Sequence, residues 1–148
     1  MELRTELEIE APPERVWSVL SDFSAYHEWN PFITGIVGEL RQDAELTVTV
    51  SPPETDDATF RPRILVCDEP RELRWRSQLW MKGLFDREQF FLCQAAPNGG
   101  TRFVHGENLS GFFVRFLGKQ LTHVARGFVY MNQALKERVE TGRRRPRT

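Results

Sequence analysis

The feature that most constrains this chain is a helical pattern in its last third. Apolar residues recur every three or four positions, at Phe113, Leu117, Leu121, Val124, Phe128, Met131, Leu135 and Val139. This spacing predicts one amphipathic helix over residues 110–140, with Ser110 as its N-terminal cap. At about 1.5 Å per residue the helix would be roughly 45 Å long. A helix of this length is long enough to cross an entire β-sheet.

The residues before this helix follow the two-residue period of β-strands. Residues 2–10 alternate between apolar and charged side chains, and two short helices are expected after them, the second ended by Asn30-Pro31. Further strands are expected near 33–40, 45–51, 58–68, 71–79, 84–95 and 101–108. Strands joined by short links form an antiparallel meander. The predicted fold is therefore α+β, with a curved antiparallel sheet of about seven strands and the long C-terminal helix lying across it.

Composition indicates a large apolar interior. The 148 residues include 11 Phe and 4 Trp against only 2 Tyr, and Phe adds apolar area without a polar group. A curved sheet closed over one long helix tends to leave space between them, so a cavity and a ligand are the leading hypothesis. We assign residues 1–140 to a single domain and expect residues 141–148 to be a disordered basic tail.

Charge and hydropathy exclude several classes of protein. The tail contributes four arginines and no acid, which leaves 16 basic against 21 acidic residues in the rest of the chain. A mildly acidic body argues against a nucleic-acid partner. No apolar run is long enough to span a membrane, and residues 1–4 do not resemble a signal peptide, so we expect a cytoplasmic protein. Cys67 and Cys93 lack metal or redox spacing and are interpreted as buried thiols, with one disulfide as the alternative.

Five segments resemble the START-like superfamily, also called SRPBCC, which has a helix-grip fold and includes polyketide cyclase/dehydrase-type proteins. They are Ile9–Trp17, Trp29–Phe32, Arg71–Trp75, Gly100–Glu107 and Gly127–Lys136. The resemblance implies a deep apolar cavity between the sheet and the terminal helix. It does not fix the activity, because the superfamily includes lipid carriers, hormone receptors, cyclases, quinone-binding proteins and chaperone cofactors.

Three polar residues are candidates for chemistry. Strand alternation groups Glu88 with Phe90, and His105 and Glu107 with Phe103, on faces that we expect to point inward. A buried histidine beside carboxylates suits proton transfer to a carbonyl compound. The alternatives are a polar role in orienting a ligand, ion pairs with Arg87 or Arg102 at the cavity mouth, and a register shifted by one residue that would expose all three.

The candidate ligand-binding residues combine these polar groups with aromatic side chains and one glycine. Gly127 interrupts the long helix, where it either allows a close backbone approach or leaves room for a ligand. The apolar segment Trp80–Phe85 could be a cavity lid, a dimer contact, a membrane-touching loop or packing against the long helix. The full ligand-binding set is Trp29, Phe32, Trp75, Phe90, Phe103, His105, Glu107, Phe113, Gly127 and Phe128.

We expect no metal and no cofactor. His27-Glu28 begins like a zinc-protease motif, but Pro31 stands where the second histidine would be. The first hypothesis is a protein that binds a small hydrophobic or aromatic ligand of lipid or polyketide size. The second is a cyclase/dehydratase-type enzyme that uses His105 with Glu88 or Glu107. The third is an adaptor or toxin-like protein whose interior is filled by its own side chains.

Overall fold

The computed structural model describes residues 1–78, 86–116 and 118–142, without the side chain of Phe113. The predicted hairpin tip at Trp80–Phe85 and most of the basic tail therefore lie outside the described residues. The elements in chain order are β1 (Glu2–Ile9), α1 (Pro13–Leu20), η1 (Phe23–Ala25), α2 (Tyr26–Trp29), β2 (Ile33–Val37), β3 (Thr47–Val50), β4 (Ala58–Phe60), β5 (Arg63–Asp68), β6 (Glu72–Gln78), β7 (Asp86–Ala95), β8 (Thr101–Ser110), η2 (Phe112–Phe116) and α3 (Lys119–Thr141).

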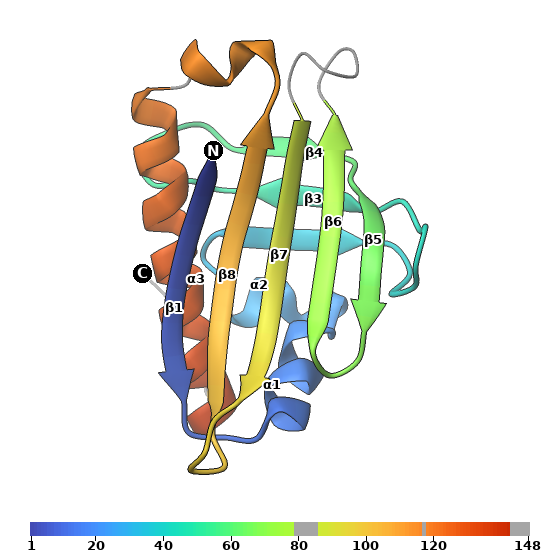
Figure 1. Ribbon diagram of the computed structural model, residues 1–148, viewed down its shortest axis with the longest axis vertical. Coiled ribbons are helices and arrows are strands. Elements are labelled where there is room, and N and C mark those ends of the chain that lie inside the picture. Colours follow the sequence, from blue (N-terminus) through green and yellow to red (C-terminus); the bar gives the residue numbers. More distant parts are fainter. Residues whose placement is uncertain (79–85, 117, 143–148) are drawn as a thin grey trace.

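The strands form an antiparallel sheet of five strands, in the order β1-β8-β7-β6-β5, and a smaller sheet of three, in the order β2-β3-β4. An isolated bridge between Glu45 and Arg63 connects the two sheets. Figure 1 shows that α3, the short helices and the smaller sheet all lie on one side of the larger sheet. This arrangement confirms the predicted fold class, a curved antiparallel sheet with a long C-terminal helix packed against it.

Three details differ from the sequence prediction. The described strands form two sheets, of five and three strands, where one sheet of about seven was expected. The strand expected at 58–68 divides into β4 and β5 at Arg61-Pro62, because proline has no amide hydrogen to donate to a neighbouring strand. The long helix begins at Lys119 and not near Ser110, which is the last residue of β8 and is paired with Asp86. Ser110 is therefore a strand residue and not a helix cap.

Glycines explain why the helix starts late. Gly111 has φ 112° and Gly118 has φ 45°, backbone conformations that interrupt a right-handed helix and that side chains disfavour. Between them lies the short 3₁₀ helix η2. The apolar spacing continues through this segment, so periodicity alone places the helix start too early. The remaining 23 residues still span about 35 Å, enough to run along the sheet.

The core lies between the larger sheet and the layer formed by α3, the short helices and the smaller sheet. The predicted stripe on α3 is buried at Phe128, Met131, Leu135 and Val139. Cys67 and Cys93 are free thiols, and burial raises the pKa of Cys93 to about 12. Among the described residues, no helix has the length and apolar character needed to cross a membrane. The same part of the chain has no group of three or more His, Cys, Asp or Glu side chains that could hold a metal.

Candidate ligand site on the inner face of the sheet

The pairing of β7 with β8 decides which side chains face α3. His105 lies opposite Phe91, and Glu107 lies opposite Gln89. Directly paired residues share a face of the sheet, so these four side chains lie together on the inner face. His105 is completely buried and Glu107 is 1% exposed. The predicted inward orientation of His105 and Glu107 therefore agrees with the structure.

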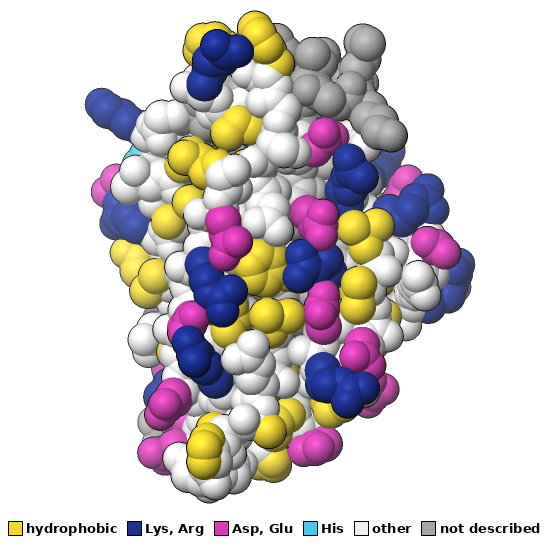
Figure 2. Space-filling view, in the orientation of Figure 1, with side chains coloured by type: hydrophobic (Ala, Val, Ile, Leu, Met, Phe, Trp, Pro, Cys, Tyr) yellow, Lys and Arg dark blue, Asp and Glu magenta, His cyan; other side chains and the backbone are white. Residues whose placement is uncertain are grey.

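The prediction for Glu88 and Phe90 is wrong. Both point to the outer face, where the Glu88 carboxylate accepts a hydrogen bond from Arg74 at 2.9 Å. The Phe90 ring covers Gly106 and lies under the Arg74 guanidinium, 4.8 Å from ring centre to cation. The physical reason is the strand register. Successive side chains of β7 point to opposite faces of the sheet, and Gln89, not Glu88, lies on the face toward α3. Figure 2 shows this outer face as interspersed basic and acidic side chains with apolar ones between them.

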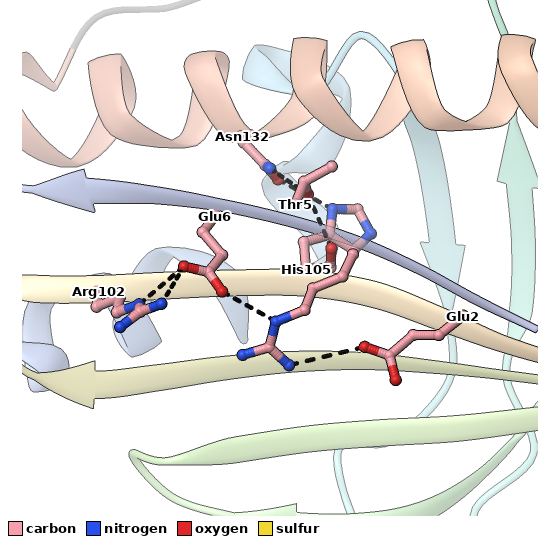
Figure 3. Close-up of polar contacts among 7 residues, drawn as sticks. Glu2, Thr5, Glu6, Arg102, His105 and Asn132 are labelled. Atoms are coloured by element: carbon pink, nitrogen blue, oxygen red, sulfur yellow. Dashed lines mark hydrogen bonds and ion pairs between the residues drawn. The ribbon is translucent and has the colours of Figure 1, made fainter.

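A chain of hydrogen bonds crosses the interior through His105. Trp75 Nε1 donates to Gln89 Oε1 at 3.1 Å, and the Gln89 amide nitrogen lies 2.8 Å from His105 Nε2. On the other side, His105 Nδ1 lies 3.0 Å from Asn132 Oδ1. Asn132 Nδ2 then donates to Thr5 Oγ1 at 2.7 Å, and the Thr5 hydroxyl donates to the His105 carbonyl oxygen at 2.8 Å. Figure 3 shows Asn132 on α3 reaching toward Thr5 and His105.

This chain selects one form of the imidazole. Because the Asn132 amide nitrogen donates to Thr5, its oxygen faces His105 and accepts, which places the proton on Nδ1. The Gln89 oxygen accepts from Trp75, so its nitrogen faces His105 and donates to an unprotonated Nε2. Burial lowers the pKa of His105 from 6.5 to about 3, against the opposing effect of the Asn132 hydrogen bond. His105 is therefore neutral at pH 7, with both ring nitrogens already bonded within the protein.

Aromatic rings enclose the same histidine. The Phe128 ring stacks on His105 with centroids 4.0 Å apart and planes 20° apart, and Phe91 lies at 4.6 Å. Phe103 lies on the same face at 6.3 Å. Through these ring contacts and the hydrogen-bonded chain, His105 connects α3 to four strands of the larger sheet, β1, β6, β7 and β8.

The inner face also carries an ion pair. Arg87 Nε donates to Glu107 Oε1 at 2.7 Å, and Arg87 Nη2 donates to Glu107 Oε2 at 3.2 Å. The Glu107 side chain is 2% exposed and that of Arg87 is 21% exposed. The guanidinium also lies 5.1 Å from the centre of the Phe60 ring on β4. This bidentate pair places charged groups in the interior, beside the His105 chain.

The remaining predicted ligand residues occupy different surroundings. Phe32 fills the position next to Gly127, where an added Cβ would collide with its ring, and it packs edge-on against Phe128 at 5.5 Å. The glycine therefore allows a close approach and does not leave open space. Trp29 is buried against Tyr26, with ring centroids 5.0 Å apart. The side chain of Phe113 lies outside the described residues.

Sequence reasoning named an ion pair with Arg87 as one alternative, and the structure shows that pair with Glu107. It missed Gln89 as an inward-facing residue, and Thr5 and Asn132 as members of the hydrogen-bonded chain. Asn132 follows Phe128 by four positions on α3, the spacing that places two side chains on the same helix face. That spacing was an available signal for a polar group facing the sheet. For Gln89 the signal was its alternation with Phe91 and Cys93.

Comparison with known proteins identifies the fold and the family of the chain. The aromatase/cyclase ZhuI from Streptomyces sp. R1128 is similar with a TM-score of 0.75 and 16% identity, over 95% of this chain and 93% of that chain. A START superfamily protein from Mycobacterium smegmatis is similar with a TM-score of 0.71 and 20% identity, over 94% of this chain and 97% of that chain. A protein from Nitrosomonas europaea is similar with a TM-score of 0.74 and 17% identity, over 96% of each chain. At these identities the similarity shows the fold alone. The sequence has no match among curated proteins. The family model described as polyketide cyclase / dehydrase and lipid transport matches residues 1–140, and the chain belongs to that family.

Proposed function

We propose that this protein binds a small apolar or aromatic ligand, of lipid or polyketide size, between the larger sheet and α3. The Arg87–Glu107 pair would contact the polar group of that ligand. The family and the helix-grip architecture support this class of function. The single observation that carries the proposal is the bidentate ion pair held on an otherwise mostly apolar inner face.

The chemistry of the pair indicates what the ligand would present. Burying two charges has a desolvation cost that their attraction only partly offsets, so such a pair is weak evidence for stability. Binding sites for small molecules typically combine apolar walls with a few convergent polar groups. Two guanidinium nitrogens of Arg87 bind Glu107, and among the described residues Nη1 has no hydrogen-bond partner and can donate to an acceptor. A ligand hydroxyl or carbonyl oxygen has the required chemistry.

The bonding of His105 favours a positioning role over proton transfer. A general acid or base must reach the reacting atom, and both ring nitrogens of His105 are bonded to protein side chains. A pKa of about 3 also keeps the ring unprotonated near neutral pH. The cyclase/dehydratase alternative with His105 as the catalytic residue is therefore the weaker of the two, and Glu88 takes no part in it from the outer face.

The test is a binding titration with two neutral aromatic probes, 2-naphthol and N-phenyl-1-naphthylamine. We expect both to saturate at one site in the wild type. Arg87→Gln should weaken 2-naphthol, which offers an oxygen to Nη1, more than it weakens the amine. Arg102→Gln removes the same charge from the outer face, where Arg102 pairs with Glu6, and should change neither affinity.

Affinities are compared per folded molecule, with the folded fraction measured by circular dichroism. Arg87→Lys, which keeps the charge, provides a second variant if Arg87→Gln is poorly folded. Wild-type protein that shows no saturable binding of either probe would contradict the proposal. It would favour the adaptor hypothesis, in which the interior is filled by the protein's own side chains. The close packing around His105 and Gly127 would agree with that hypothesis.

A further inference from the structure

A pocket at the edge of the larger sheet is lined by three arginines. It has a volume of about 390 Å³, lies where the β4–β5 link meets β6, and includes Arg61, Arg63 and Arg76. Among the described residues of its lining, Glu45 is the one carboxylate. The chain without its last residues is acidic, with 16 basic against 21 acidic side chains, so three cations around one pocket run against the general charge of the body.

The strand register sets two of these cations against each other. Arg63 on β5 lies directly opposite Arg76 on β6. Like charges at directly opposed positions of an antiparallel pair destabilise the sheet. Arg76 approaches Asp86 only at 3.7 Å, and among the described residues neither Arg61 nor Arg63 has a carboxylate within ion-pair distance. Glu88 lies opposite Arg76 on its other side, and Glu45 lies opposite Arg63, so part of this repulsion is offset. The described lining of the pocket still carries more positive than negative charge.

The Arg63 side chain is held in place by the backbone. Arg63 Nη1 donates to the backbone carbonyl of Asp43 at 2.7 Å, which fixes one end of its guanidinium. Glu45 and Arg63 are backbone neighbours through the bridge between the two sheets, so this corner of the pocket is fixed by strand geometry. The Arg76 side chain is 38% exposed and lies next to the buried Ser77.

We propose that this pocket binds a phosphoryl group. Guanidinium groups match the geometry of phosphate and carboxylate oxygens with paired N–H donors. A phosphate monoester carries close to two negative charges near neutral pH and three acceptor oxygens, which suits three arginines better than the single charge of a carboxylate. The pocket lies at the sheet edge, so this proposal does not depend on the interior ligand.

The experiment is a titration with inorganic phosphate, followed by ³¹P NMR and by calorimetry. We expect saturable binding that is tighter at pH 8 than at pH 5.5, because the dianion is the preferred form. Arg61→Gln and Arg63→Gln should each weaken binding by about tenfold, the effect of one lost charge-assisted contact. Arg71→Gln, an exposed arginine at the opposite end of β6, removes the same charge and should leave binding unchanged.

A second titration distinguishes the source of the phosphoryl group. Vesicles of phosphatidylcholine with phosphatidic acid present it as a lipid headgroup, and pure phosphatidylcholine vesicles are the control. If the protein binds the mixed vesicles and Arg61→Gln reduces that binding, the pocket binds a lipid headgroup. If the protein binds inorganic phosphate but not the mixed vesicles, the pocket binds a soluble phosphate.

Three outcomes would overturn the proposal. They are no saturable binding of either form, equal losses in Arg61→Gln and Arg71→Gln, and competition by acetate as effective as that of phosphate. Binding of 2-naphthol is measured on the same Arg61→Gln protein, where we expect it to be unchanged. Failure of the phosphoryl site is thereby distinguished from failure of the interior site.

Discussion

The two faces of the β7–β8 pair both carry polar side chains, but they use them differently. On the inner face, neutral groups form a continuous hydrogen-bonded chain through His105, beside the ion pair Arg87–Glu107. The outer face carries ion pairs such as Arg74–Glu88 and Arg102–Glu6, which water can reach. Figure 3 shows both kinds of contact: Arg102 lies beside Glu6 on the outer face, apart from the contact of Asn132 with Thr5 and His105.

This contrast indicates what burial does to a polar contact. In a low-dielectric interior each hydrogen bond is stronger, and an unpaired group is costly, so the chain must be satisfied at every member. On the outer face water and salt weaken each pair, and such pairs contribute little to stability. The inner contacts should therefore fix the arrangement of strands and helix, while the outer contacts mainly keep the surface soluble.

The largest expected effect comes from removing the ring that covers the inner face. Phe128 is fully buried and stacks on His105, so Phe128→Ala should lower the free energy of unfolding by about 3–5 kcal/mol. Denaturant unfolding measures this change. Val129→Ala is the control, because the next residue on α3 is 45% exposed and should be nearly neutral. Similar losses for both variants would show that α3 does not cover the sheet through this face.

Breaking the inner ion pair should have the next largest effect. The Glu107 side chain is only 2% exposed, and Arg87→Gln removes its bidentate partner. The expected loss is about 2–3 kcal/mol, below the range for fully buried pairs because Arg87 is partly exposed. Chemical denaturation at pH 7 provides the measurement. An unchanged midpoint would mean that water reaches Glu107 and that the inner face is not a dry environment.

His105 predicts a pH dependence of stability. Its pKa of about 3 in the folded protein lies below the ordinary 6.5, so between these values the unfolded chain binds a proton that the folded one does not. Stability is fully present above pH 6.5 and falls as the pH decreases. From pH 7 to pH 5, a range in which ordinary carboxylates titrate little, the loss should be about 2 kcal/mol.

Unfolding curves at several pH values measure this slope, and His105→Gln is the matched variant. It should be less stable at pH 7 and should show a flatter slope between pH 7 and pH 5. A slope as steep as that of the wild type would assign the pH dependence to other groups.

The fold could be predicted from the sequence because its main signals are local. Two-residue alternation and the three- to four-residue spacing on α3 follow directly from which side chains are buried. The start of the helix could not be placed by spacing, since Phe113 and Leu117 continue the pattern across Gly111 and Gly118. Those glycines were the available evidence for a break.

The site depends on information that is less local. Glu88 and Gln89 are both plausible inward residues, and a shift of one position exchanges the two faces. The hairpin loop sets that register through a hydrogen bond from Ala96 N to Gly100 O, a geometry that the loop sequence alone does not determine. The contact of Asn132 with His105 joins α3 to β8 across 27 positions in the chain, so only the assembled fold brings them together.

The smallest expected effect lies on the outer face and completes the comparison. Arg102→Gln removes the partner of Glu6, as Arg87→Gln removes the partner of Glu107, but the Arg102 side chain is 54% exposed. Water replaces the lost contact, and Arg4 still donates to Glu6 at 2.9 Å, so the unfolding midpoint should equal that of the wild type within error. Any remaining difference from the wild type should be smaller in high salt than in low salt, since screening weakens exposed ion pairs. If Arg102→Gln destabilised the protein as much as Arg87→Gln, burial would not be what separates the two faces.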